Sequence, residues 1–154
     1  MITIREAQWP QDRDAVARLM RAYADSLDID LGFQGFEAEL AGLPGSYARP
    51  RGVVLIAWPP DEPAGIVAYR PQDAAVCEMK RLYVRPCFRG TGLGRHLCEA
   101  LIEEARLHGY RRMVLDTLAS MAAARRLYAA LGFRATAPYY DNPLPGTAYL
   151  ALDL

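Results

Sequence analysis

A glycine-rich segment from Val84 to Arg95, with the sequence VRPCFRGTGLGR, constrains the fold of this chain more than any other feature. The apolar run Val76 to Val84 before it predicts a strand, and apolar residues at helical spacing after it predict a helix from Gly92 to His108. Glycines let backbone N–H groups approach a ligand closely, and the free N–H groups and dipole of a helix start favour an anion. We therefore expect an anion site here, with Arg89 and Arg95 adding positive charge.

The rest of the chain is predicted to form short strands and amphipathic helices. Apolar periodicity predicts further strands over residues 2–5, 53–58, 64–69, 113–116 and 148–152, and further helices over residues 12–27, 36–43 and 120–131. We predict the order β-α-α-β-β-β-α-β-α-β-β, which includes one more strand before the last. With 154 residues, 52% of them hydrophobic, this order predicts a single α+β domain over residues 1–154, with a mixed, mostly antiparallel sheet flanked by helices.

Three kinds of phosphate-binding loop compete for the glycine-rich segment. A P-loop is excluded because no Gly-Lys-Ser/Thr ends the segment and Lys80 lies upstream of it. A dinucleotide-binding fold requires its glycines in the first strand–helix unit, whereas several antiparallel-type strands precede this loop. The remaining pattern is Arg/Gln-x-x-Gly-x-Gly, which Arg89, Gly92 and Gly94 satisfy. For the loop alone, a tight helix entry that binds no ligand stays open as an alternative.

That pattern resembles the acetyl-CoA pyrophosphate loop of the GNAT superfamily of N-acetyltransferases. The strand Met79 to Val84 before the loop, the segment Leu127 to Phe133 after it and the order of elements are similar to the same family over nearly the whole chain. The resemblance implies a GNAT-like fold with acetyl-CoA as cosubstrate. It also implies direct transfer of acetyl to a primary amine, with no metal and no covalent acyl-enzyme.

The resemblance further implies where the cosubstrate binds. Main-chain groups of Leu82, Tyr83 and Val84 would hold the pantetheine arm and the thioester carbonyl, and the N–H of Leu82 or Val84 is the expected oxyanion donor. The pyrophosphate would be held by the loop residues Phe88, Arg89, Gly90, Thr91, Gly92, Leu93, Gly94 and Arg95.

Two side chains are candidate catalytic groups by the same resemblance. Tyr128 is at the position whose phenol protonates the departing CoA thiolate, although it also fits a core residue on an apolar helix face. Glu78 is at a position used for the general base, and a solvated or arginine-paired carboxylate is the equal alternative. A regular strand would put Glu78 on the face of Leu82, whereas a bulge, typical of the family here, would change that. Asp116, at the end of the next strand, is the competing carboxylate and a candidate acceptor contact.

The first half of the chain offers an acidic acceptor region. Residues 1–79 carry 7 basic and 12 acidic side chains, whereas residues 80–154 carry 11 and 6, so the halves are expected to face different ligands. No basic residue occurs from 22 to 48, where Asp28 and Asp30 are candidate contacts for a cationic amine. An acidic helix face that binds no ligand is the alternative.

A loop from 136 to 146 combines aromatic and amide side chains, as pocket-lining loops do. Tyr139, Tyr140 and Asn142 are therefore candidate acceptor contacts. A dimer contact or simple packing of the loop is the equal alternative.

Composition and isolated residues exclude other classes of protein. No apolar stretch approaches the roughly 20 residues of a membrane helix, and no leader-like sequence opens the chain, so we expect a cytoplasmic protein without membrane contact. Three cysteines without CxxC or histidine spacing indicate no disulfide framework and no metal site, and we expect them buried or half-buried. No Gly-x-Ser-x-Gly elbow surrounds Ser120, which we expect to cap the following helix.

The sequence therefore predicts an acetyl-CoA-dependent N-acetyltransferase acting on a small-molecule or amino-acid-like amine. Two alternatives stay open: a non-catalytic acyl-CoA-binding module, and an acetyltransferase acting on protein N-termini or lysines. A homodimer is compatible with such folds, and nucleic acid is not an expected partner because the loop and ordinary helix faces account for the basic residues.

Overall fold

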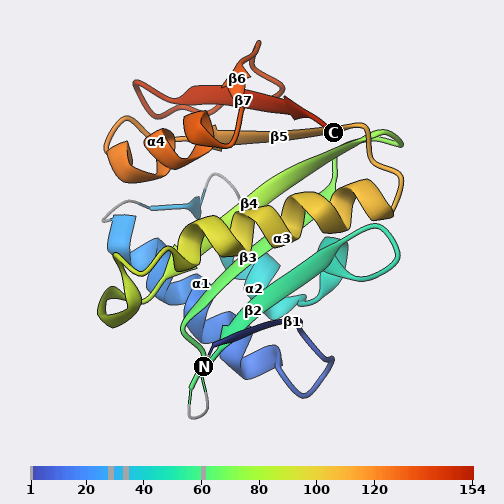
Figure 1. The fold of residues 1–154 in the computed structure, drawn as a ribbon, viewed down its shortest axis with the longest axis vertical. Coiled ribbons are helices and arrows are strands. Elements are labelled where there is room, and N and C mark those ends of the chain that lie inside the picture. Colours follow the sequence, from blue (N-terminus) through green and yellow to red (C-terminus); the bar gives the residue numbers. More distant parts are fainter. Residues whose placement is uncertain (1, 28–29, 33–34, 60–61) are drawn as a thin grey trace.

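Seven strands of the described chain form one mixed sheet in the order β1-β2-β3-β4-β5-β7-β6 (Figure 1). The computed structural model describes residues 2–27, 30–32, 35–59 and 62–154. The strands are β1 (Thr3–Glu6), β2 (Val53–Trp58), β3 (Gly65–Pro71), β4 (Val76–Val84), β5 (Arg112–Thr117), β6 (Arg134–Ala135) and β7 (Ala148–Asp153). The α-helices are α1 (Arg13–Leu27), α2 (Phe36–Ala41), α3 (Leu93–Leu107) and α4 (Ala122–Ala130), with 3₁₀ turns η2 (Gly45–Tyr47) and η3 (Pro86–Phe88).

The predicted α+β fold with a mixed, mostly antiparallel sheet is confirmed. Neighbouring strands pair antiparallel except β4 and β5, which pair parallel. The predicted order of strands and helices is also the observed one. Among the described residues, no helix is long and apolar enough to cross a membrane.

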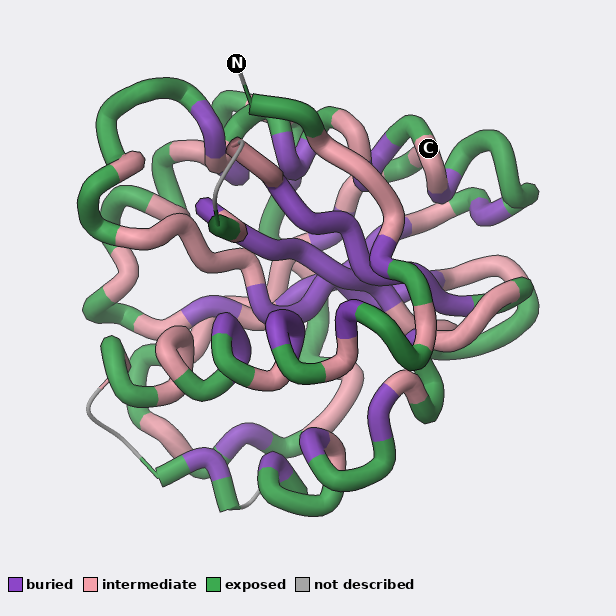
Figure 2. The backbone as a smooth tube through the Cα atoms, turned by 90° about the horizontal axis from the view of Figure 1, so that it is seen from below, coloured by how far each residue is buried: buried purple, intermediate pink, exposed green. Residues whose placement is uncertain are grey.

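Helices cover both faces of the sheet, which explains why β2 and β3 are apolar on both sides rather than alternating. Val54 and Ile56 of β2 pack with α1 and α2 in one core, whereas Val53 and Leu55 pack with α3 in a second core that also contains Tyr128 of α4. Buried segments accordingly run through the middle of the molecule, with exposed loops around them (Figure 2).

The parallel strands β4 and β5 separate part-way along their length. Their paired positions end at Glu78 and Val114, although β4 continues to Val84 and β5 to Thr117. Beyond Glu78, β4 therefore pairs with β3 and no longer with β5 in the described chain. This separation opens a space in the sheet beside the start of α3.

A bulge interrupts β4 at the same place. Ala68 of β3 is opposite Lys80 and Ile66 is opposite Tyr83, so β4 has one residue more than β3 over this stretch. Arg81 takes a positive φ of 64°, a conformation that is uncommon outside glycine. The strand is therefore bulged and not regular, which is the second of the two alternatives for Glu78 and Leu82.

Two local expectations need correction. Ser120 does not cap α4, because the N-cap residue is Met121 and no side chain caps the helix. Cys87 is exposed rather than buried or half-buried, whereas Cys77 and Cys98 are buried.

Candidate active site

A groove of about 540 Å³ lies between helix α4 and the end of β4 that has separated from β5. Its walls include three residues of β4, Leu82, Tyr83 and Val84, and two residues of the loop and α3, Arg89 and Gly94. Side chains of α1 and of the start of α4 complete it: Tyr23, Ser26, Leu27, Ser120, Met121, Ala122, Ala123, Ala124 and Leu127. The groove thus contains five residues predicted to bind the cosubstrate.

The glycine-rich loop presents an uncapped helix N-terminus at one end of this groove. Gly90 and Gly92 have φ values of 77° and 83°, in the left-handed region where glycine is favoured. Gly92 is the N-cap of α3 and no side chain caps the helix, so the first N–H groups of α3 keep their capacity for an anion. The Arg89 side chain donates through Nε to the Val84 carbonyl at 3.0 Å, which ties the loop to β4.

The remaining loop residues make contacts within the protein. Thr91 donates through Oγ1 to the Phe88 carbonyl at 2.6 Å, and Phe88 packs against the core on the α3 side. Leu93 is a buried core residue, so only its backbone can contact a ligand. Arg95 forms an exposed ion pair with Glu99 at 3.4 Å. The loop as a whole fits a phosphate ligand through backbone N–H groups more than through arginine side chains.

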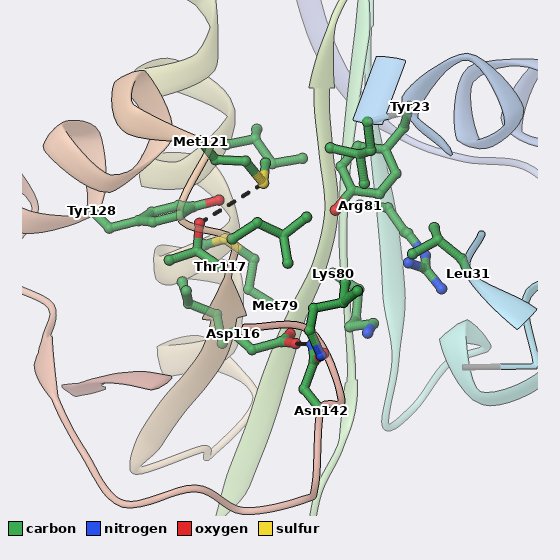
Figure 3. A pocket seen from close by; sticks show the side chains of 15 residues that line it. Tyr23, Leu31, Met79, Lys80, Arg81, Asp116, Thr117, Met121, Tyr128 and Asn142 are labelled. Atoms are coloured by element: carbon green, nitrogen blue, oxygen red, sulfur yellow. Dashed lines mark hydrogen bonds between the residues drawn. The ribbon is translucent and has the colours of Figure 1, made fainter. Parts of the chain in front are cut away.

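An inner cavity of about 30 Å³ continues from the groove into the split between β4 and β5 (Figure 3). Tyr128, Asp116 and Leu82, which the sequence offered as separate candidates, all line it, and Asn142 reaches it from the 136–147 loop. Its other lining residues are Tyr23, Leu27, Leu31, Met79, Lys80, Arg81, Leu115, Thr117, Leu118, Met121 and Leu144. A space of this size holds one or two water molecules.

Tyr128 combines a core position with a place on the cavity wall. Its ring contacts Phe133 edge-on, with centroids 5.8 Å apart, and belongs to the core on the α3 side. Burial raises the pKa of the phenol well above its usual value, so Tyr128 holds its proton at physiological pH. The core and proton-donor interpretations are therefore compatible, because the buried phenol also borders the cavity.

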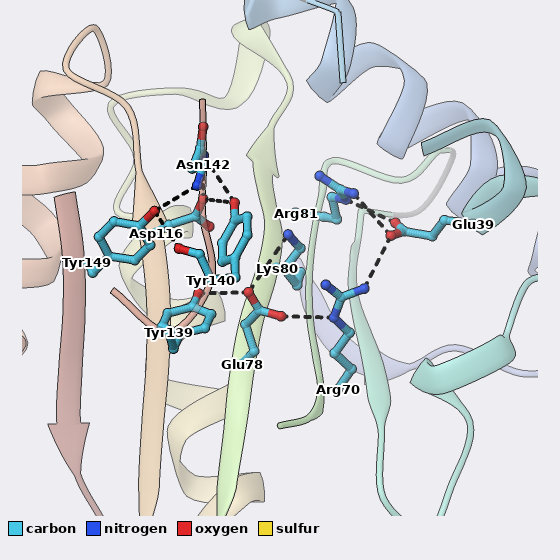
Figure 4. A network of polar contacts seen from close by, with 10 residues as sticks. All are labelled: Glu39, Arg70, Glu78, Lys80, Arg81, Asp116, Tyr139, Tyr140, Asn142 and Tyr149. Atoms are coloured by element: carbon cyan, nitrogen blue, oxygen red, sulfur yellow. Dashed lines mark hydrogen bonds and ion pairs between the residues drawn. The ribbon is translucent and has the colours of Figure 1, made fainter. Parts of the chain in front are cut away.

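Glu78 lies in a buried polar network on the α1 and α2 side of the sheet (Figure 4). Arg70 donates through Nε to its Oε1 at 2.9 Å, and the Tyr139 hydroxyl donates to its Oε2 at 2.7 Å. The bulge places Leu82 against the opposite core, on the α3 side. Glu78 is thus paired with an arginine, and it does not line the inner cavity.

Asp116 is held by the loop between β6 and β7. The Tyr140 hydroxyl and the Asn142 amide both donate to its Oδ2, the latter at 2.8 Å. Burial raises the pKa values of the Tyr139 and Tyr140 phenols, with nearby carboxylates as a further cause. The Tyr149 hydroxyl donates to the Tyr140 carbonyl at 2.9 Å and fixes the loop from behind. The three loop residues predicted to contact the acceptor therefore donate hydrogen bonds to the two candidate carboxylates: Tyr139 to Glu78, and Tyr140 and Asn142 to Asp116.

Asp30, a candidate contact from the acidic region of the first half, does not line this cavity. Asp30 is exposed and accepts a hydrogen bond from the Gly32 N–H at 2.7 Å, in a surface pocket beside Arg21 and Phe36. Asp28 lies outside the described residues. Among the described residues, no group of three or more His, Cys, Asp or Glu side chains could hold a metal ion.

The sequence interpretation missed the basic side of the network. Arg81 donates through Nε and Nη2 to the two carboxylate oxygens of Glu39, both at 3.0 Å, and these two side chains are 2% and 9% exposed. Lys80 Nζ lies 3.9 Å from Glu78 Oε2. The sequence did contain a signal, namely two consecutive charged residues, Lys80 and Arg81, inside an apolar strand. A regular strand would place these two side chains on opposite faces of the sheet.

Comparisons with known proteins agree with this architecture. The profile of the Acetyltransferase (GNAT) family matches residues 4–133. An uncharacterized N-acetyltransferase of Schizosaccharomyces pombe is 41% identical over 155 residues, which cover 99% of this chain and 95% of that protein. The N-acetylaspartate synthetase of Danio rerio is 36% identical over 110 residues, 70% of this chain and 39% of that protein. The structure of yncA from Salmonella typhimurium with its cofactor acetyl-CoA has a TM-score of 0.74 at 24% identity, covering 99% of this chain and 93% of that chain.

Proposed function

The chain belongs to the GNAT family of acetyltransferases and has its fold, and from this premise we propose that it transfers the acetyl group of acetyl-CoA directly to a primary amine of a small, amino-acid-like acceptor. One observation carries the proposal. The separation of β4 from β5 and the uncapped N-terminus of α3 border a single groove. A ligand with a phosphate at one end and an extended, hydrogen-bonding arm fits such a groove.

The cosubstrate assignment follows the groove from the loop inward. The pyrophosphate would bind the backbone N–H groups after Gly90 and Gly92, and the pantetheine arm would run along Leu82 to Val84 as an added strand. The acetyl-CoA present in the yncA structure, a neighbour in fold, supports this choice of ligand. Acetyl-CoA supplies the acetyl group in the activated form of a thioester.

Leu82 and Tyr128 would act on the reacting groups in the inner cavity. The acceptor nitrogen forms a C–N bond to the acetyl carbon while the C–S bond breaks. The N–H of Leu82 or Val84 would stabilise the negative charge on the carbonyl oxygen. Tyr128 would donate its phenolic proton to the departing sulfur.

The proton of the amine needs an acceptor on the cavity wall. Asp116 lines the cavity, whereas Glu78 is paired with Arg70 and held by Tyr139. We therefore propose that Asp116, directly or through a water molecule, accepts the proton that the sequence interpretation assigned first to Glu78. Tyr140 and Asn142 would position Asp116 and border the acceptor.

A small acceptor is favoured because side chains of β4, β5 and the 136–147 loop narrow the inner cavity. The name of the Danio rerio relative, N-acetylaspartate synthetase, supports an amino acid among the possible acceptors. The alternatives, action on protein N-termini or lysines and non-catalytic binding of acyl-CoA, differ from this proposal in the acceptors that are turned over.

Thermal unfolding with and without acetyl-CoA tests the proposal. Ligand at about 100 times its dissociation constant should stabilise the native state by about 2.7 kcal/mol, which raises Tm by about 5–10 °C for a chain of this length. Gly92→Ala and Gly92→Glu both introduce a Cβ where φ is 83° and no atom lies within 4 Å, so both carry the same backbone strain. Only Gly92→Glu adds a negative charge beside the expected pyrophosphate.

The two variants separate strain from charge. Two unit charges about 6 Å apart repel by about 3 kcal/mol at an effective dielectric constant of about 20, equivalent to about 100-fold in affinity. Gly92→Ala should therefore keep the acetyl-CoA shift and Gly92→Glu should lose it. No shift in the unmodified protein at millimolar acetyl-CoA would refute the cosubstrate site. A clear shift without turnover of any amine would favour the non-catalytic binding module.

A further inference from the structure

We propose that the acceptor is a free amino acid whose ammonium binds Asp116 and whose carboxylate binds Lys80. This inference rests on the proposed function and narrows its acceptor to a zwitterion. Both side chains line the inner cavity, one from each of the two strands that separate there (Figure 3). Asp116 of β5 and Lys80 of β4 thus border the same small space.

Lys80 is the cation best placed to receive a carboxylate. Its side chain is 4% exposed, and its Nζ lies 3.9 Å from Glu78 Oε2. An ammonium has three donors and can bond a ligand in addition to its existing contacts. Burial lowers the pKa of Lys80, so a carboxylate beside it would stabilise the charged form. Of the other two cations of the network, Arg70 does not line the cavity, and Arg81 donates to both carboxylate oxygens of Glu39.

Asp116 already accepts the kind of group that an amine would offer. Its Oδ2 accepts N–H and O–H donors from Asn142 and Tyr140. An ammonium supplies three further N–H donors and a full positive charge, which makes stronger bonds to a carboxylate than a neutral amide does. The amine can therefore bind beside Tyr140 by replacing the Asn142 amide.

Charge balance favours a zwitterion over a simple amine. The network of Figure 4 contains three carboxylates, Glu39, Glu78 and Asp116, and three cations, Arg70, Lys80 and Arg81. An alkylamine would bring one unmatched positive charge into this buried site, whereas the backbone of an amino acid brings one charge of each sign. Burying an unmatched charge costs free energy, whereas the two charges of a zwitterion are compensated when each contacts an opposite charge.

The loop from 136 to 147 would have to shift for the amino acid to enter. The cavity of about 30 Å³ is smaller than any amino acid, and Asn142 and Leu144 from this loop form part of its wall. Side-chain hydrogen bonds from Tyr139, Tyr140 and Asn142 hold the loop against β4 and β5. Such contacts can exchange for ligand contacts without breaking the sheet.

Matched acceptors test the proposal directly. For several side chains, kcat/KM would be compared between the amino acid, its α-amide and the amine lacking the carboxyl group. The acetylated product would be measured by mass spectrometry, because the exposed Cys87 is accessible to thiol reagents. We expect the acid to exceed both analogues by about 10- to 100-fold, the usual effect of one hydrogen bond to a charged group. Equal or better use of the amide or the amine overturns the proposal.

Lys80→Met removes the charge at nearly constant side-chain volume. This substitution should lower kcat/KM for the amino acid by about 10- to 100-fold and change kcat/KM for the α-amide by less than about threefold. The preference for the acid over the amide should therefore disappear. Arg106→Met, an exposed change on α3 at a residue 49% exposed, should leave the preference intact. Retention of the acetyl-CoA shift in Lys80→Met would show that the variant folds and still binds the cosubstrate.

A binding measurement makes the test independent of turnover. In the presence of CoA, the amino acid should raise Tm further, and its amide should not. If neither turnover nor this extra stabilisation appears with any amino acid, the inference is wrong even where acetyl-CoA alone stabilises the protein. Absence of the acetyl-CoA shift in the unmodified protein would instead refute the proposed function itself.

Discussion

Tyr128→Phe removes a single oxygen atom and separates catalysis by Tyr128 from its role in the core. The phenylalanine ring keeps the edge-on contact with Phe133 and its place in the core on the α3 side. Among the residues that the structure describes, none forms a hydrogen bond with the hydroxyl. Its loss should therefore change the free energy of unfolding by less than about 1 kcal/mol, which corresponds to less than about 4 °C in Tm.

The effect on turnover should be much larger. Proton donation by a positioned side chain contributes about 10²- to 10⁴-fold, so kcat should fall by at least about 100-fold with acetyl-CoA binding retained. Because burial raises the pKa of Tyr128 well above 10, the phenol stays protonated at every practical pH. The unmodified enzyme should thus show no alkaline decline in kcat from this residue below about pH 10.

A second buried tyrosine provides the control. Tyr69 has a buried hydroxyl with no hydrogen-bond partner in the described chain, and its ring stacks edge-on against Tyr110, away from the cavity. Tyr69→Phe should leave kcat unchanged. The assay is steady-state acetylation of a primary amine at saturating acetyl-CoA, followed by mass spectrometry. A kcat for Tyr128→Phe within about threefold of the unmodified enzyme would refute the proton-donor role.

Three further predictions concern stability. Arg81→Met should cost about 3–5 kcal/mol in urea unfolding, because it leaves the Glu39 carboxylate buried without its bidentate partner. Gly52→Ala should cost about 3 kcal/mol by the same measurement, since a Cβ there would lie 2.3 Å from the Ser46 carbonyl oxygen. Burial raises the pKa of Cys98 from 9.0 to about 12, so the stability that its thiol contributes is full below pH 9 and is lost as pH rises towards 12. Cys98→Ala should flatten that alkaline loss of stability in urea titrations.

The fold followed from the sequence because local patterns agreed with one another. The apolar strands and the periodic helices predicted the order of elements, and the resemblance around the loop predicted how the sheet is arranged. Gly90 and Gly92 occupy the left-handed conformations that a tight entry into α3 requires. Such features depend on residues close together in the chain, so a single sequence contains them.

The polar network could not be predicted in the same way. Glu39 and Arg81 are 42 positions apart, and nothing in either segment by itself indicates that they pair. Whether Glu78 acts as a base or as an arginine partner depends on Arg70 of the neighbouring strand and on Tyr139 of a distant loop. The acidic region around Asp30 shows the converse, since a run without basic residues does not determine which way its carboxylates face.

The bulge in β4 links the stability of the fold to the shape of the site. A φ of 64° at Arg81 costs a non-glycine residue about 1–2 kcal/mol, and such strain persists only where surrounding contacts hold it. The ion pair with Glu39 from α2 supplies such a contact. The same extra residue lets Lys80 and Arg81 both border the cavity and turns Leu82 towards the opposite core. Helix α2 therefore helps to set the geometry of the acceptor site, although it lies on the other side of the sheet from α3, whose N-terminus faces the cosubstrate groove.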